Sequence, residues 1–145
     1  MVIAGEWRID EDGISRPYLA LEVGGKDGAI AEEAFLVDTG ADCTVFTARL
    51  LSKLSGSLDA ESDQSVLLGI GGQSEAVTVR AELRFRTMQG TQVTVHGEFA
   101  AAIGSTSLDV SLLGRGVLAN FDVIVSRRRN DVLLIAGNHF YSVTG

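Results

Sequence analysis

Residues 35–46 of the chain read Phe-Leu-Val-Asp-Thr-Gly-Ala-Asp-Cys-Thr-Val-Phe, an apolar run followed directly by an Asp-Thr-Gly triplet that begins at Asp38. The apolar run favours a buried strand. The small Gly40 lets another backbone approach the strand end. The stretch therefore predicts a carboxylate, that of Asp38, held rigidly where an apolar strand ends.

The Asp-Thr-Gly triplet occurs once in the chain. Two carboxylates that share one proton can hydrolyse a peptide bond, because the ionised one activates water while the protonated one polarises the scissile carbonyl. The pairs Asp12-Gly13 and Asp27-Gly28 lie in polar stretches and indicate turns instead. If Asp38 works by this route, a second copy of the chain must supply the other carboxylate. The alternative is a structural aspartate that accepts backbone hydrogen bonds in a turn.

Composition limits the fold. A chain of 145 residues with 46% hydrophobic residues is sufficient for one domain, which we expect to span residues 1–145. Seventeen glycines against a single proline indicate short strands joined by tight turns, so the sequence predicts an all-β class.

Charge and cysteine content limit the partners and the compartment. The formal net charge of -7 disfavours binding to nucleic acid or anionic membranes. The single cysteine, Cys43, cannot form an intrachain disulfide and is compatible with a reducing compartment, so we expect a cytoplasmic location. No stretch has the length and hydrophobicity of a membrane span or a signal peptide, and the chain is expected to be soluble, with no membrane segment.

Hydrophobic periodicity and turn residues predict the order of the elements. The expected strands cover residues 18–23, 34–37, 43–46, 76–86, 92–99, 121–125, 132–135 and 139–143. Thr47 is expected to cap a short helix over residues 48–54, and a second short helix is expected around residues 116–119. Arg127, Arg128 and Arg129 indicate a solvated hairpin tip.

Three segments appear in an order that resembles one family. They are residues 35–46, Leu68-Gly69-Ile70-Gly71-Gly72, and Leu112-Leu113-Gly114-Arg115 followed by Val117-Leu118. Together they resemble the retropepsins, the retroviral-type aspartic proteases, over roughly residues 18–135. The resemblance implies a closed or partly open β-barrel with a flap hairpin. It also implies a homodimeric aspartic endopeptidase that acts on peptides or proteins without a cofactor or metal.

The resemblance also assigns roles to residues of the active-site loop. It implies that Asp38 is catalytic, that Thr39 hydrogen-bonds across the dimer, and that Gly40 completes the catalytic triplet. Gly40, Ala41 and Asp42 are implied contacts to the substrate. Arg115 is implied to pair with Asp42 and to brace the loop.

The glycine-rich segment Gly69-Ile70-Gly71-Gly72 resembles the tip of the flap, with the backbone N–H of Ile70 reaching substrate through water. A lid needs glycines because its tip changes backbone conformation on closure. An ordinary glycine-rich turn remains the alternative. A P-loop is disfavoured because its lysine and hydroxyl residues are missing.

Other residues are assigned structural roles. Cys43 lies where a subsite residue would sit, but has no histidine nearby in the sequence to activate it and is expected to contribute packing. His96 and His139 form neither a metal cluster nor a nucleophile–base pair. Because viral relatives dimerise partly through interleaved terminal strands, Phe140, Tyr141 and Val143 are expected interface residues.

Two alternatives to the protease remain open at this point. The same fold can serve as a non-catalytic dimerisation or peptide-binding module, since fold and activity separate readily. A monomeric β-barrel binder in which Asp38 is only structural is the other alternative. The protease hypothesis predicts activity at mildly acidic pH.

Overall fold

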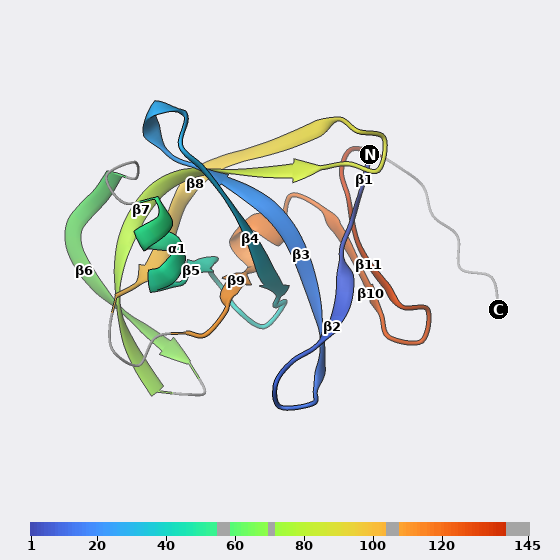
Figure 1. Ribbon diagram of the computed structural model, residues 1–145, viewed down its shortest axis with the longest axis horizontal. Coiled ribbons are helices and arrows are strands. Elements are labelled where there is room, and N and C mark those ends of the chain that lie inside the picture. The colour runs from blue at the N-terminus through green and yellow to red at the C-terminus, as the bar shows by residue number, and fades with distance from the viewer. Residues whose placement is uncertain (55–58, 70–71, 104–107, 139–145) are drawn as a thin grey trace.

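Strands form most of the part of the chain that the structure describes, which also holds two short helices and one 3-10 turn (Figure 1). The computed structural model describes residues 1–54, 59–69, 72–103 and 108–138, and the side chains of residues 59–74 are outside that description. The strands are β1 (Val2–Ala4), β2 (Glu6–Ile9), β3 (Ser15–Gly24), β4 (Ile30–Val37), β5 (Val45–Phe46), β6 (Asp59–Gly69), β7 (Gly72–Arg86), β8 (Gln92–Ala102), β9 (Ser111–Leu113), β10 (Asp122–Ser126) and β11 (Asp131–Ile135). The helices are α1 (Ala48–Lys53) and α2 (Arg115–Leu118), and the 3-10 turn is η1 (Lys26–Gly28).

The described strands form two sheets. The larger has the order β2-β3-β4-β9-β5-β8-β7-β6 and folds back on itself, because β3 also pairs with β7. The smaller has the order β1-β11-β10 and lies at the right of the view in Figure 1. The prediction of an all-β class with a partly open barrel is confirmed.

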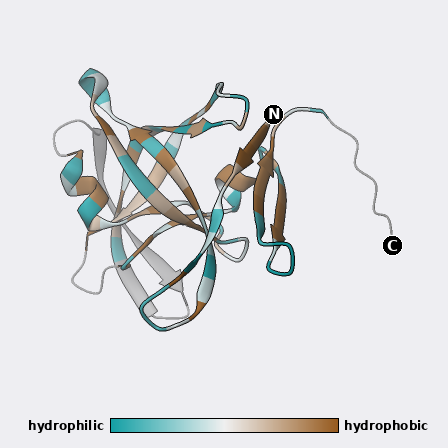
Figure 2. Ribbon diagram, turned by 45° about the vertical axis from the view of Figure 1, so that its right-hand side comes forward, coloured by the Kyte–Doolittle hydropathy of each residue, from teal (hydrophilic) through white to brown (hydrophobic). Residues whose placement is uncertain are grey.

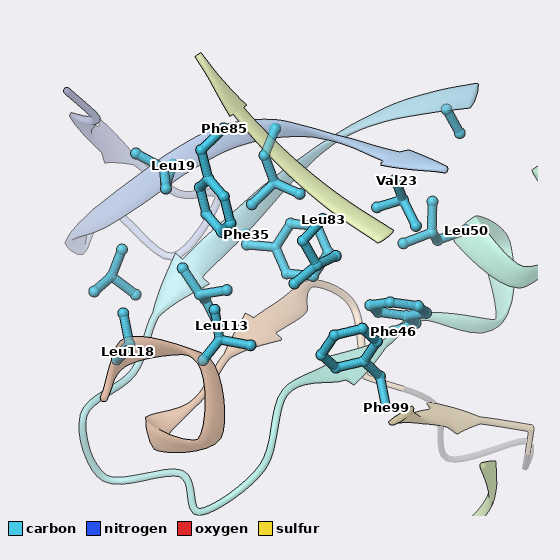
Figure 3. Packing of buried hydrophobic residues seen from close by; sticks show 14 of the residues in the cluster. Leu19, Val23, Phe35, Phe46, Leu50, Leu83, Phe85, Phe99, Leu113 and Leu118 are labelled. Carbon is cyan, nitrogen blue, oxygen red and sulfur yellow. The ribbon is translucent and has the colours of Figure 1, made fainter. Parts of the chain in front are cut away.

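The core lies inside the folded-back sheet, where aromatic side chains from three strands meet (Figure 3). The Phe46 ring lies 5.9 Å from that of Phe35 in an edge-on arrangement and 5.4 Å from that of Phe99. Such pairs add about 0.5–1.5 kcal/mol to the free energy of area burial. Because Phe35 belongs to β4, this packing fixes the strand that leads to Asp38.

Most predicted elements are present. On β7, Val79 and Leu83 are buried while Arg80 and Arg86 are exposed, as the period-2 pattern predicts. Helix α1 begins after Thr47, whose hydroxyl accepts a hydrogen bond from the Leu50 N–H at 3.1 Å. Among the described residues, no helix has the length and hydrophobicity to cross a membrane.

The turn predictions are confirmed as well. Gly13 and Gly28 have φ angles of +77° and +74°, the left-handed region that glycine favours in tight turns. The three arginines lie at the exposed turn between β10 and β11, where Arg127 also stacks 5.5 Å above the Trp7 ring. The predicted closing strand over residues 139–143 lies outside the described residues.

The N-terminal residues form two strands that the pattern of the sequence does not predict. Ile3 is buried and pairs with Leu134 of β11, while β2 pairs with β3. Gly5 joins the two strands and donates to the Val132 carbonyl at 2.7 Å. A side chain at Gly5 would overlap the Tyr18 carbonyl, so only glycine allows the chain to cross from one sheet to the other.

A buried carboxylate ties β4 to its neighbours. The Glu33 side chain is only 3% exposed and lies 3.3 Å from Arg49 Nη2 and 3.7 Å from Lys53 Nζ, both on α1. Ser111 on β9 donates to Glu33 at 3.3 Å and accepts from the Thr47 N–H at 3.1 Å. This network joins β4, β9 and α1. It also stabilises the buried Glu33 carboxylate, since burying a charge costs free energy unless the charge is paired and hydrogen-bonded.

We expect Glu33→Ala to lower the free energy of unfolding by about 1–3 kcal/mol, since it leaves the buried Ser111 hydroxyl without its acceptor. The adjacent Glu32 is exposed, so Glu32→Ala serves as the matched control and should change stability by less than about 0.5 kcal/mol. Urea denaturation measures both values. Equal effects of the two substitutions would contradict the proposed importance of the network.

Candidate active site

Asp38 follows the last residue of β4, a strand that lies between β3 and β9 in the larger sheet. Its backbone N–H donates to the Leu113 carbonyl at 3.1 Å, and its carboxylate oxygen Oδ1 accepts from the Gly40 N–H at 3.0 Å. The side chain is half-buried, whereas Thr39 and Gly40 are exposed. The carboxylate is therefore oriented by the backbone of its own turn and remains accessible.

The loop from Asp38 to Thr44 is held by backbone hydrogen bonds to the start of α2. The Arg115 N–H donates to the Ala41 carbonyl at 2.8 Å, and the Gly116 N–H donates to the Asp42 carbonyl at 3.1 Å. The buried Thr44 hydroxyl accepts from the Gly114 N–H at 3.0 Å. These bonds bring together the two segments that the sequence places 70 residues or more apart.

Two backbones cross at Gly114 with no room between them. A Cβ at this position would overlap the carbonyl group of Cys43 and lie 3.0 Å from the Ala41 carbonyl oxygen. The crossing also corrects the interpretation of Cys43 as a packing residue. The backbone of Cys43 contacts Gly114, and Cys43 is exposed instead of packed in the core.

Arg115 and Asp42 form an ion pair through Nη2 and Oδ1, the pairing that the family resemblance implies. Both side chains are largely exposed, so the pair adds little to the overall stability. Its position is more informative, since it joins the loop that follows Asp38 to the first turn of α2.

The predicted flap corresponds to the hairpin of β6 and β7. Gly69 is the last residue of β6 and pairs with Gly72, the first residue of β7. Ile70 and Gly71 lie outside the described residues. The role of this hairpin as a lid therefore stays a prediction.

The hairpin of β2 and β3 carries a charged cluster that sequence reasoning missed. Tyr18 of β3 pairs with Leu36 of β4, two residues before Asp38. Arg16 binds Asp10 and Asp12, each at 2.7 Å. The Arg16 hydrogen bonds lower the pKa of Asp12 to about 2. The signal in the sequence was the pair of carboxylates spaced six and four residues before an arginine across a turn.

Burial and the Asp10 carboxylate both change the pKa of the Tyr18 phenol. Its hydroxyl hydrogen-bonds Asp10 at 2.9 Å, and burial followed by that hydrogen bond raises the pKa of the phenol. The turn of this hairpin is therefore held by charge-assisted bonds.

In the part of the chain that the structure describes, no three His, Cys, Asp or Glu side chains gather in a way that could hold a metal ion. His96 lies on β8 with its Nδ1 3.6 Å from Glu82, and both side chains are at the surface. His139 lies outside the described residues.

Comparisons with known proteins show which family the chain resembles. The family model described as retroviral aspartyl protease matches residues 14–126. The fold is similar to that of the EIAV protease complexed with the inhibitor HBY-793, with a TM-score of 0.54 and 22% identity, over 72% of this chain and 86% of that chain. It is also similar to a retropepsin-like aspartic protease from Rickettsia conorii, with a TM-score of 0.54 and 19% identity, over 92% of this chain and 88% of that chain. No curated protein matches the sequence.

Gly114→Ala should destabilise the protein by about 2–3 kcal/mol, because the new methyl group must displace the backbone of Cys43. Gly116→Ala is the matched control. Its Cβ would lie 3.6 Å from its nearest neighbour, and alanine favours helix by up to about 1 kcal/mol. Thermal unfolding of both variants measures the difference. If Gly114→Ala were as stable as Gly116→Ala, the claim that the Cys43 backbone leaves no room for a side chain at Gly114 would be wrong.

Proposed function

The chain belongs to the retroviral aspartyl protease family, and we propose that it is a homodimeric aspartic endopeptidase. In this proposal each copy contributes one Asp38, and the two carboxylates act on one extended peptide. The half-buried Asp38 at the rigid end of β4 is the observation that carries the proposal. A chain with one Asp-Thr-Gly triplet supplies half of the site, so the enzyme needs two copies.

The proposed reaction begins with two carboxylates that share one proton, since two like charges at close range cannot both ionise readily. The ionised Asp38 takes a proton from water while the oxygen of that water attacks the scissile carbonyl carbon. The protonated Asp38 of the other copy gives its proton to the carbonyl oxygen, which forms a tetrahedral diol. Transfer of a proton to the amide nitrogen then breaks the C–N bond and releases an acid and an amine.

Residues around Asp38 take supporting roles in this proposal. Thr39 would hydrogen-bond across the dimer, while Gly40, Ala41 and Asp42 would present polar groups to the substrate backbone. The exposure of Thr39, Gly40 and Asp42 supports this assignment. The β6–β7 hairpin would close over the peptide, with Gly69, Ile70, Gly71 and Gly72 at its tip, and closure would exclude water from the site.

We expect Asp38→Asn to remove peptide cleavage, by about a thousandfold or more, because an amide can neither activate water nor carry the shared proton. A diverse peptide library digested at mildly acidic pH and analysed by mass spectrometry gives the rates. Thermal unfolding and sedimentation of the same samples control for folding and assembly. A statine-type transition-state mimic should inhibit the wild type.

Equal cleavage by wild type and Asp38→Asn would contradict the proposal. A folded dimer that binds peptides without cutting them at any pH would instead identify a non-catalytic binding or dimerisation module.

Arg115→Gln should lower the cleavage rate by about tenfold or more while changing the free energy of unfolding by less than about 1 kcal/mol. The pair with Asp42 is exposed and adds little stability, yet it orients the loop that carries the substrate contacts. Parallel kinetics and urea denaturation separate the two effects. Arg80 on β7, also paired at the surface, provides the control in Arg80→Gln. Unchanged kinetics in Arg115→Gln would contradict a bracing role.

A further inference from the structure

Strand β8 has a long stretch of unpaired edge in the larger sheet. Strand β7 pairs with it along its whole length, from Gln92 to Ala102, whereas β5 pairs only with Ala100 and Ala101. The stretch from Gln92 to Glu98 therefore has no neighbour on its second side among the described strands. In Figure 1 the first half of β8, in yellow, runs along the upper rim of the molecule.

The hydrogen bond of Ala100 shows which backbone groups of β8 face the open side. Its N–H donates to the Thr44 carbonyl at 3.2 Å, on the side of β5 and away from β7. The register of β8 with β7 has no bulge, and in a regular strand the N–H and C=O groups of every second residue point to the same side. The backbone groups that face the open edge are therefore those of residues 92, 94, 96 and 98.

The side chains of this stretch suit a strand that receives another strand. Val93 and Val95 pack partly against the core on the inner face, whereas Thr94 and His96 are exposed on the outer face. Figure 2 shows hydrophilic and hydrophobic bands alternating along the β7–β8 hairpin. Valine and threonine also favour extended backbone. An added strand would thus meet apolar side chains on one face and polar side chains on the other.

The same stretch lacks the features that protect a strand edge from pairing. From Gln92 to Gly97 it contains no proline, lysine, arginine, aspartate or glutamate. Glu98, at its end, binds Arg80 of β7 at 3.0 Å, so part of its charge is neutralised within the sheet. The edge strands β1 and β2 have only three and four residues, and such short edges offer little to pair with.

We propose that this edge of β8 binds an extended segment of a partner protein, which joins the sheet as a further antiparallel strand. Backbone hydrogen bonds supply the affinity, and the side chains on the two faces supply the selectivity. The antiparallel arrangement is the one we infer, because its pairing is slightly more stable per residue than the parallel one. The inference does not depend on the proposed function, since the edge contains none of the residues assigned to the reaction.

The segment that fits this edge alternates β-branched apolar residues with threonine or lysine. Its apolar side chains lie on the face of Val93 and Val95, and its polar side chains lie on the face of Thr94 and His96. Basic residues suit the polar face, where Glu98 lies at one end of the stretch. The net charge of -7 also favours the approach of a cationic segment over an acidic one.

A labelled peptide with the sequence Lys-Val-Thr-Val-Thr-Val-Lys is the probe. Fluorescence anisotropy measures its binding to the Asp38→Asn variant, which is used so that the probe is not cleaved. In the antiparallel arrangement the N–H groups of its threonines face β8 and those of its valines face solvent. N-methylation of the two threonines should weaken binding at least about tenfold, whereas N-methylation of two valines should leave binding unchanged. Equal effects of the two patterns, or a larger effect at the valines, would overturn the inference.

A substitution in β8 tests the same edge from the side of the protein. Thr94→Pro removes one outward N–H and obstructs an incoming strand, but it keeps the bonds to β7, since the Thr94 N–H does not face β7. Binding should weaken at least about tenfold in Thr94→Pro. The matched control, Thr94→Ala, changes only the side chain and should bind within about twofold of the parent. Circular dichroism confirms folding, and the N-methylated peptides decide the question if Thr94→Pro does not fold.

Other occupants give different results. If the peptide binds folded Thr94→Pro as tightly as the parent, it lies elsewhere, for example in the active site, and the inference is overturned. If Thr94→Pro abolishes self-association of the protein in the absence of peptide, a second copy occupies the edge and the inference is likewise overturned. A wild type that binds the peptide through β8 but cuts no peptide supports the inference and contradicts the protease.

Discussion

The crossing of two backbones at Gly114 is the constraint on which the rest of the site depends. The carbonyl of Cys43 lies where any side chain at Gly114 would have to be, so the loop after Asp38 rests directly on the start of α2. This close approach allows the N–H groups of Gly114, Arg115 and Gly116 to reach acceptors in the loop. A larger residue would separate the two segments and remove all three hydrogen bonds together.

Packed elements lie on both sides of this crossing. Toward the core, β4 and β9 are held parallel, and the buried Glu33 connects both to α1 through Ser111 and its basic partners. Toward the surface, α2 continues through Phe121, which packs against Phe85 of the core, into β10. The turn that carries Asp38 and the start of α2 thus belong to one continuous packed unit. This matters for a two-carboxylate site, because its chemistry requires the two groups within hydrogen-bonding reach of one another.

Elements with a clear local pattern were predictable. The alternation along β7, the Thr47 cap and the glycine turns each depend on residues close together in the sequence, and the structure places them as expected. The elements that were missed depend on distant partners. β1 and β2 are too short and too mixed to show a period, and they are strands because β11 and β3 offer them pairing. The close approach of the Cys43 and Gly114 backbones likewise joins segments 71 residues apart in the chain, and Cys43 is exposed.

The sequence by itself determined the family and the all-β class, because the order and spacing of three short motifs can be read along the chain without its fold. It also determined that the chain has one Asp-Thr-Gly triplet, the count on which the proposed two-copy site depends. Only the tertiary structure decided that Glu33 is buried while Glu32 is exposed, that Tyr18 pairs with Leu36 next to the active-site turn, and that Ile124 and Val125 of β10 are exposed. Burial, register and edge position arise from which strands become neighbours, and that choice is made by packing between segments far apart in the chain.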